Sequence, residues 1–221
     1  MSALFIKSFV FNAFMENTYV VYDEEGNAAI FDPGCYEKEE EKALEMFIEQ
    51  HGLKVQALYN THCHIDHVLG NEFVKRRWKV GLQIHAVELP YLEAVKSYAG
   101  NYGFHGYQPA EPNSFIKEGS SISIGKHQLQ ILFAPGHAPG HVLIYDAAGD
   151  QCLVGDVIFK GSIGRTYLPG GDFDTLIKSI KTQLFNLPDH TRLYPGHGEP
   201  TTVGFEKEYN PFCGRYAGFE S

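Results

Sequence analysis

The stretch Thr61-His62-Cys63-His64-Ile65-Asp66-His67 follows an apolar run and determines how the rest of the chain is interpreted. It places three imidazoles and one carboxylate within six positions. Residues two apart in an extended segment point the same way, so His62, His64 and Asp66 can converge. A turn into the following helix then brings His67 beside Asp66. Imidazole and carboxylate are ligands that zinc and neighbouring transition metals accept, so the stretch predicts a metal site.

A single histidine in this stretch would be an ordinary core or turn residue. Several unpaired polar groups sharing one pocket would be costly without a ligand to bind them, which favours the metal interpretation for the cluster as a whole. Cys63 is out of phase with its neighbours and is not expected to be a ligand.

Three later motifs place more such side chains at the ends of predicted strands. The stretch Phe133-Ala134-Pro135-Gly136-His137-Ala138-Pro139-Gly140-His141 sets two histidines in Pro-Gly turns, which can project a side chain into a shared site. Asp156 closes the predicted strand 152–154, and its two oxygens can bridge two cations. Finally, His197 ends the last predicted strand in Tyr194-Pro195-Gly196-His197-Gly198. Each of these motifs is weak when taken alone.

The composition is that of a folded globular protein. Of the 221 residues, 43% are hydrophobic, 14% aromatic and 20% charged, far from the sparse, highly charged profile of disorder. We expect one domain over residues 1–221. Acidic residues outnumber basic ones 27 to 18, for a net charge of -9, and no basic stripe is present. Nucleic acid is therefore not an expected partner.

The N-terminal residues, the apolar segments and the cysteines predict the cellular compartment of the protein. The N-terminal residues lack a basic region followed by an apolar run and a cleavage site, and no segment approaches 18 unbroken apolar residues, so neither secretion nor membrane insertion is expected. The four cysteines are scattered without CxxC pairing: Cys35, Cys63, Cys152 and Cys213. This pattern favours a reducing cytoplasm.

Strands and helices alternate along the chain. Strands are predicted at 4–10, 18–22, 28–31, 55–59, 82–86, 121–124, 129–133, 142–145, 152–154 and 192–194, and helices at 37–50, 72–78, 88–96 and 174–185. The segment 97–118 has no sustained period and is predicted to be a long loop that either borders a site or is a surface excursion. In each half of the chain, His or Asp residues follow the ends of predicted strands. We therefore expect two sheets that meet along one edge, with helices on the outside.

The order of these motifs, from Asp32 to His197, resembles that of the metallo-beta-lactamase superfamily, and within it the short bacterial glyoxalase II-like hydrolases. The resemblance implies an α/β fold, an αββα sandwich of two mixed sheets with helices on the outer faces. It assigns seven ligands to two metal ions: His62, His64 and His137 to the first, Asp66, His67 and His197 to the second, and Asp156 to both. It also implies that Asp32 lies behind the ligands as an orienting carboxylate, and His141 either beside it in that supporting role or as a hydrogen-bonded turn residue.

Differences between this chain and the superfamily pattern indicate which subgroup it resembles. Class B beta-lactamases usually carry Cys in place of Asp156, so antibiotic hydrolysis is not expected. Arg165 and Tyr167 resemble the cation and tyrosine that glyoxalase II uses for glutathione, and we include Lys160 with them as a candidate substrate-binding residue. Only about two dozen residues follow His197, and we expect the C-terminal helical domain of glyoxalase II to be missing. Glu199 stands in place of a substrate-binding tyrosine, which leaves the identity of the thiol open.

The expected activity is cleavage of a thioester, such as a hydroxyacylglutathione or a related small acyl-thiol, by a hydroxide that bridges two divalent ions. We expect zinc, with iron or manganese as alternatives, and assign catalytic roles to Asp66 and Asp156. A second hypothesis is a persulfide dioxygenase with one iron on His62, His137 and Asp156, although His141 stands where that group commonly shows Cys. Another ester or lactone hydrolase, and a noncatalytic metal-binding protein, are further alternatives. The sequence is silent on oligomeric state.

Overall fold

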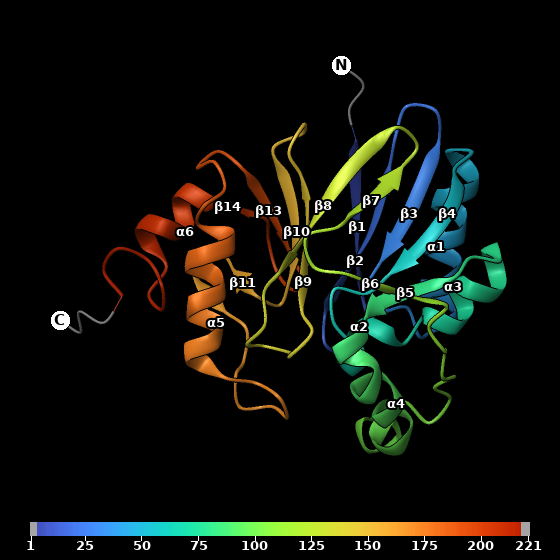
Figure 1. Cartoon of the computed structure of the whole chain (residues 1–221). Coiled ribbons are helices and arrows are strands. Elements are labelled where there is room, and N and C mark those ends of the chain that lie inside the picture. Colours follow the sequence, from blue (N-terminus) through green and yellow to red (C-terminus); the bar gives the residue numbers. More distant parts are fainter. Residues whose placement is uncertain (1–3, 218–221) are drawn as a thin grey trace. The chain divides into compact units, whose positions relative to one another are not determined.

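The computed structural model describes residues 4–217, which form two compact units. Within that range, unit 1 comprises residues 4–117 and 122–128, and unit 2 comprises residues 118–121 and 129–217. Figure 1 shows the elements of each unit along the chain. The expectation of a single domain stays a prediction.

Unit 1 is built on a mixed six-stranded sheet in the order β1-β2-β3-β4-β5-β6. The first three strands are antiparallel and the last three join β3 in parallel. Its strands are β1 (Phe5–Phe11), β2 (Glu16–Tyr22), β3 (Asn27–Phe31), β4 (Lys54–Tyr59), β5 (Leu82–His85) and β6 (Ser114–Ile116). Its helices are α1 (Lys38–Gln50), α2 (Ile65–Val68), α3 (Asn71–Trp78) and α4 (Leu89–Tyr98), with 3₁₀ turns η1 (Ala86–Glu88) and η2 (Ala99–Tyr102).

Local sequence explains where α1 begins and ends. The Glu40 side chain accepts a hydrogen bond from the backbone N–H of Glu37, the residue before the helix. Gly52, at φ +60°, follows its end. Leu44 and Ile48, one turn apart, are buried in the same apolar cluster as residues of the strands and of α3 and α4. Helices α1, α3 and α4 therefore pack on the sheet of unit 1. Polar residues follow the carboxyl ends of its parallel strands.

Unit 2 contains most of a second mixed sheet, in the order β14-β13-β10-β9-β8-β7. The strands are β7 (Ser121–Ile124), β8 (His127–Phe133), β9 (Val142–Asp146), β10 (Gln151–Gly155), β13 (Arg192–Pro195) and β14 (Thr201–Thr202). A small hairpin, β11 (Ile158–Phe159) with β12 (Ser162–Ile163), follows β10. The helices are α5 (Phe173–Ser179), which continues into a π-helical turn η3 (Ile180–Leu184), and α6 (Val203–Tyr209).

The core of unit 2 joins this sheet to its helices. Leu143, Val154 and Leu193 come from the strands, and Leu176 comes from α5. They belong to one cluster that also includes Val203 of α6. The expected αββα class is thus represented by two mixed sheets with helices. Strands β10 and β13 end, and β9 begins, next to residues that the sequence singles out.

Most predicted elements are confirmed within one to three residues at their ends, but some short ones were missed. The sequence did not predict α2, β6, the β11–β12 hairpin, β14 or α6. The segment 97–118 is not a continuous loop, because it holds η2 and β6, which pairs with β5. The predicted helix 174–185 changes to a π turn at Ile180. The missed strands and α2 have two to four residues and α6 has seven, too few side chains to show a clear period.

Among residues 4–217, no helix has both the length and the apolar composition needed to cross a membrane.

Candidate metal centre

In unit 1 the candidate ligands lie at the carboxyl end of β4, where the strand gives way to a single helical turn. His64 is still extended and precedes α2, and His67 N donates to His64 O at 3.1 Å. This turn brings three rings together: the His62 centroid lies 4.8 Å from that of His64 and 4.2 Å from that of His67. Asp66 lies in the helical turn and not in an extended stretch, and its Oδ2 is 3.8 Å from His67 Nε2.

Asp32 organises the start of this cluster. Its carboxylate accepts hydrogen bonds from Thr61 N (2.7 Å) and Thr61 Oγ1 (2.6 Å). Because the single hydroxyl proton of Thr61 goes to Asp32, the 3.1 Å contact between Thr61 Oγ1 and His62 Nδ1 requires the proton to be on Nδ1. The lone pair of His62 is therefore on Nε2, the nitrogen available to a metal ion.

Asp32 adopts a backbone conformation that few non-glycine residues use, with φ at +48°. It also precedes Pro33, a position that normally favours extended backbone. Asp32 N donates to Tyr59 O at 2.9 Å, which ties this turn to the end of β4. Strain at this residue is consistent with a functional position.

Two buried carboxylates face His67 from the side of Nδ1. Asp32 Oδ2 lies 3.4 Å from this nitrogen and Glu16 Oε1 lies 3.9 Å from it. Glu16 is fully buried, and this burial raises the pKa of its carboxyl well above the ordinary value, partly offset by the nearby His67. Thr18 Oγ1 donates to Glu16 Oε2 at 2.9 Å. Donor atoms of Asp32, His62 and His67 all lie within 4.8 Å of one another, a spacing that a metal ion can accept.

In unit 2, His137 is held in a tight turn by two close backbone approaches. Gly136 has φ +131°, and a Cβ at this position would collide with the backbone of Leu176 in α5. A Cβ on Gly164 would collide with the carbonyl oxygen of Asp156 and lie 2.8 Å from His137 Nδ1. His137 Nδ1 is 2.8 Å from the carbonyl oxygen of Arg165, so Nδ1 carries the proton and Nε2 the lone pair.

Asp156 lies at the centre of the unit 2 cluster. Its Oδ2 is 3.5 Å from His137 Nε2 and 3.5 Å from His197 Nε2. Gly196 N donates to Gly155 O at 2.7 Å, which fixes the loop carrying His197 against the end of β10. The Phe159 ring meets the His197 ring edge-on, with centroids 5.9 Å apart.

His141 is close to this cluster but turned toward the backbone. Its Nε2 accepts a hydrogen bond from Asp156 N at 3.0 Å, so that nitrogen supports the Asp156 turn. Its ring centroid is 6.1 Å from that of His137.

The candidate substrate-binding residues lie in the hairpin and loop that follow Asp156. Lys160, in the β11–β12 turn, pairs with Glu199 at 2.9 Å, and this hydrogen bond and charge raise the pKa of Lys160. Tyr167 is 78% exposed and Arg165 is exposed too. Arg165 contacts the cluster through its backbone carbonyl, which lies 2.8 Å from His137 Nδ1.

Two residues in unit 1 were missed from the sequence. Thr61 contacts both Asp32 and His62. Glu16 lies beside His67 but is 51 positions earlier in the chain, in β2. Cys63 is buried in the apolar core, as its phase predicted. Each unit thus gathers buried or half-buried imidazoles beside carboxylates, and this donor chemistry fits a transition-metal ion.

Comparison with known proteins agrees with this chemistry. The family profile described as "Metallo-beta-lactamase superfamily" matches residues 12–197. The chain is 37% identical over 202 residues to "Hydroxyacylglutathione hydrolase GloC" of Haemophilus influenzae, which covers 90% of this chain and 93% of that protein.

Two solved structures share the fold. "Crystal structure of BLEG-1 B3 metallo-beta-lactamase" has a TM-score of 0.86 at 32% identity, covering 95% of this chain and 99% of the other. "Crystal structure of TTHA1623 in a di-iron-bound form" has a TM-score of 0.82 at 38% identity, covering 94% and 99%.

Proposed function

The chain belongs to the metallo-beta-lactamase superfamily and is a metallo-hydrolase, and we propose that it cleaves a thioester formed between a small hydroxyacyl group and a thiol. The observation that carries the proposal is in unit 2, where the Nε2 atoms of His137 and His197 both lie 3.5 Å from one oxygen of Asp156. Two imidazole nitrogens beside one carboxylate oxygen are a donor set that a cation can bind.

The ligand assignment follows the resemblance described above. His62, His64 and His137 would hold one ion, Asp66, His67 and His197 a second, and Asp156 both. Divalent ions bound there would polarise a carbonyl group and lower the pKa of water from about 15.7 toward roughly 7. Zinc suits this donor set, and iron or manganese are alternatives.

The chain's own residues prepare the site by fixing protons. Thr61 and the Arg165 carbonyl hold the proton of His62 and His137 on Nδ1, which leaves each Nε2 ready to ligate. Both oxygens of Asp32 are engaged by Thr61, so we assign Asp32 to orientation and not to ligation. Asp66 would ligate and orient the attacking water, while Arg165, Tyr167 and Lys160 would contact the substrate.

The substrate class rests on the similarity to the protein named hydroxyacylglutathione hydrolase. The similarity to BLEG-1 makes beta-lactam hydrolysis a competing activity to test. The persulfide dioxygenase hypothesis requires one iron on His62, His137 and Asp156, and predicts oxygen consumption. We propose small molecules as the partners of this acidic chain and the cytoplasm as its location.

Elemental analysis of the purified protein, paired with three assays, tests this function. The assays are hydrolysis of S-lactoylglutathione, oxygen uptake with glutathione persulfide, and hydrolysis of a chromogenic cephalosporin. Two metal ions per chain with thioester cleavage would support the proposal. One iron with oxygen uptake, or cephalosporin cleavage without thioester cleavage, would reject it.

A further inference from the structure

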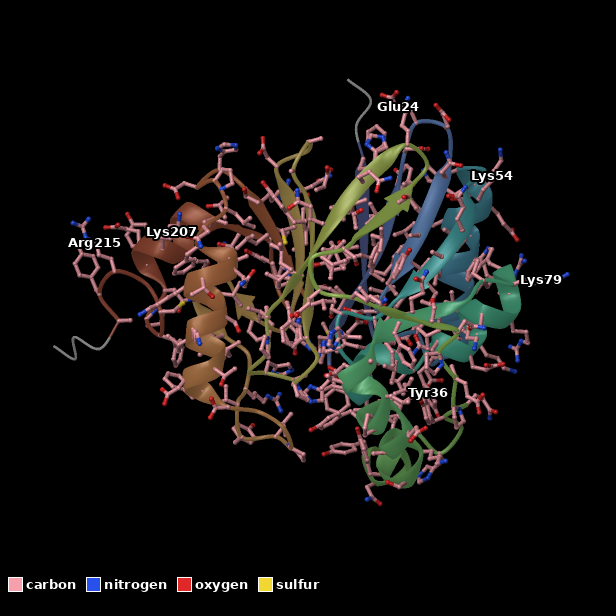
Figure 2. The ribbon with its side chains drawn as sticks, viewed as in Figure 1. Glu24, Tyr36, Lys54, Lys79, Lys207 and Arg215 are labelled. Atoms are coloured by element: carbon pink, nitrogen blue, oxygen red, sulfur yellow. The ribbon has the colours of Figure 1, made fainter. Side chains whose placement is uncertain are left out.

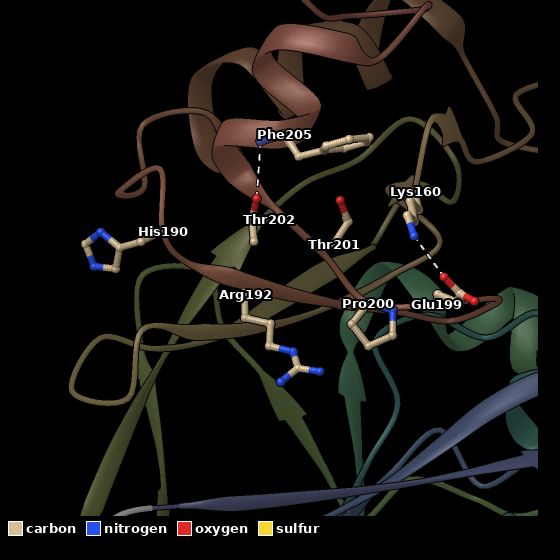
Figure 3. Close-up of a pocket in the computed structure, with 8 residues that line it drawn as sticks. All are labelled: Lys160, His190, Arg192, Glu199, Pro200, Thr201, Thr202 and Phe205. Carbon is tan, nitrogen blue, oxygen red and sulfur yellow. Dashed lines mark hydrogen bonds and ion pairs between the residues drawn. The ribbon is translucent and has the colours of Figure 1, made fainter.

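Two loops of unit 2 each carry a candidate ligand and then border the same open groove. The first follows Asp156 and forms the β11–β12 hairpin, and the second follows His197 and leads into β14. Figure 3 shows this groove, with Lys160 contributed by the first loop and Glu199 and Thr201 by the second. The placement of both ligands therefore depends on what holds these two loops together.

At the rim of the groove, the contacts between the loops are weak. Lys160 and Glu199 form an ion pair at 2.9 Å, but their side chains are 50% and 78% exposed. Water and salt screen such a pair, so it contributes little. The Phe159 ring meets the His197 ring edge-on, with 5.9 Å between the centroids. Neither contact fixes the backbone of the loop that carries His197.

A buried carboxylate in α6 joins the same two loops much more firmly. Glu206 is fully buried and accepts hydrogen bonds from Gly161 N in the hairpin at 3.1 Å and from Thr201 Oγ1 in β14 at 2.6 Å. Asn210 Nδ2 donates to Glu206 at 2.7 Å and to Ser162 O in the hairpin at 3.0 Å. Hydrogen bonds to a buried carboxylate are stronger than those between exposed groups. We call Glu206, Gly161, Thr201 and Asn210 the Glu206 clamp.

The sequence of α6 directs Glu206 toward the interior of the unit. Thr202 caps the first turn of the helix through the hydrogen bond drawn in Figure 3. Val203, three residues before Glu206 and so on the same face, belongs to the core of unit 2. Lys207, labelled in Figure 2, instead pairs with Asp189. The helix therefore brings one carboxylate to a place where the hairpin and β14 both offer donors.

The Glu206 clamp supports the loop of His197 from its far side. On the near side, Gly196 N donates to Gly155 O at 2.7 Å. On the far side, Thr201 follows His197 by four residues. Between these two supports Gly198 has φ +76°, a conformation that glycine adopts easily. Loss of the Thr201 hydrogen bond would remove the second support and let His197 shift relative to the end of β10.

The clamp also acts on the loop that follows Asp156. Asn210 holds Ser162 in β12, three residues before Arg165. The carbonyl oxygen of Arg165 lies 2.8 Å from His137 Nδ1 and sets the proton of that ring. A shift of the hairpin would therefore move the group that leaves Nε2 of His137 free to ligate.

We propose that Glu206, together with Thr201 and Asn210, is a positioning residue of the metal centre. It acts through the backbone of the two loops, so that Asp156 and His197 are already in place when an ion binds. A site prepared in this way loses less freedom on binding and holds its ion more tightly. This role rests on the proposed function only in that the cluster binds a metal ion, and it does not depend on the substrate.

Two variants of Thr201 test the role with little change in the size of the side chain. Thr201→Val removes the hydroxyl that donates to Glu206 and keeps the branched shape, whereas Thr201→Ser keeps the hydroxyl. Thr201→Val should lower the affinity for zinc roughly two- to tenfold, the fold-change that corresponds to one net hydrogen bond. Thr201→Ser should keep most of the native affinity. Competition with a chromogenic chelator measures both values.

Thr191→Val is the matched control. Thr191 is a buried threonine of the same unit, next to the end of β13 where Arg192 pairs with Gln151, away from His197. This variant should keep native zinc affinity even where its melting temperature falls. Cobalt(II) gives a second readout, because its absorption bands depend on the number and geometry of the ligands. The bands should change in Thr201→Val and stay native in Thr201→Ser and Thr191→Val.

Amide hydrogen exchange tests the clamp without metal affinity or activity as the readout. Glu206→Gln replaces one acceptor oxygen with a donor amide among partners that donate to it. The Gly161 amide should then exchange at least about tenfold faster, and segments 157–165 and 196–202 should lose protection with it. Strand β9 serves as the internal reference and should keep its protection. If Glu206→Gln does not fold, Thr201→Val gives the same comparison for segment 196–202.

Native zinc affinity and a native cobalt spectrum in Thr201→Val would overturn the proposal. An equal loss of affinity in Thr191→Val would do so as well, because general stability would then explain the effect. Faster exchange of both loops with unchanged zinc affinity would show that the clamp does not position the ligands. If no thioester is cleaved but the zinc and cobalt differences are found, the clamp stands and the proposed substrate fails. If thioester cleavage is found without those differences, only the clamp is rejected.

Discussion

Asp32 Oδ2 lies 3.4 Å from His67 Nδ1, on the side of the ring away from Asp66. A carboxylate in this position fixes the ring and raises the basicity of the opposite nitrogen. We therefore expect Asp32→Asn to lower metal affinity roughly 10- to 100-fold, the usual cost of losing such a partner. Competition with a chromogenic chelator measures the affinity directly.

Asp23→Asn is the matched control for Asp32. Asp23 is an equally buried carboxylate of unit 1, but it accepts hydrogen bonds from Asn27 and Glu25 in a turn outside the metal cluster. Its variant should keep native metal affinity. If Asp32→Asn bound metal as tightly as this control, the orienting role given to Asp32 would be wrong.

Asp156→Ala should abolish hydrolysis and lower the metal content. The variant removes the oxygen on which His137 and His197 converge at 3.5 Å each. Elemental analysis and the S-lactoylglutathione assay give the two readouts. Asp146→Ala, which removes a buried carboxylate of β9 bonded to Gln151, should lose stability while keeping its metal. Full turnover in Asp156→Ala would contradict the bridging role.

The residues of the two clusters stand out in the sequence because they are close in the chain or directly follow a strand. His62 to His67 lie within six positions, and Asp156 directly follows the buried strand β10. Apolar periods of four or more residues also gave the main strands and helices. Local chemistry of this kind is readable without knowledge of tertiary contacts.

The supporting residues could not be read in the same way. Glu16 meets His67 only because β2 pairs into the same sheet as β4 through β3. Thr61 looked like part of the motif, but its role depends on Asp32, 29 positions earlier. Glu206 anchors the groove through α6, a seven-residue helix too short for a clear period. Long-range hydrogen bonds leave no local pattern.

Gly136→Ala should destabilise unit 2 and reduce its metal content. The φ of +131° alone is expected to cost about 1–3 kcal/mol for a residue with a side chain. The new Cβ would also collide with Leu176, which displaces the turn carrying His137. Chemical denaturation and elemental analysis measure both effects.

Gly52→Ala provides the comparison for Gly136. Gly52 has φ +60° and open space around a Cβ, so its variant isolates the backbone cost, about 1–2 kcal/mol. It should keep its metal. Equal losses of stability and unchanged metal in both variants would show that contact with Leu176 does not position His137.

Chelation should lower the melting temperature of the holoprotein, because an ion bound only by the folded state stabilises it by about 2.7 kcal/mol at a free concentration 100 times its Kd. Differential scanning calorimetry before and after EDTA treatment measures the change. Zinc, iron and manganese are then added back separately, and recovery of both stability and turnover identifies the ions that fit. If the protein loses its metal and its melting temperature does not change, the prediction that bound metal stabilises the folded state would be wrong.

Asp172 gives a pH-dependent prediction for the helix that packs against the His137 turn. Its side chain accepts a hydrogen bond from Thr175 N at 2.8 Å and caps α5, and this bond lowers the pKa of Asp172 below its ordinary value of 3.8. A lowered folded-state pKa means that the stabilisation is fully present above the unfolded value and is lost as pH falls through the folded one. Asp172→Ala should therefore lower the melting temperature at pH 7, and the difference from native protein should shrink below about pH 4.

Asp174→Ala, in the first turn of the same helix, should show little change at either pH. A constant difference between Asp172→Ala and native protein down to pH 2 would mean that the charge of Asp172 does not contribute to the cap.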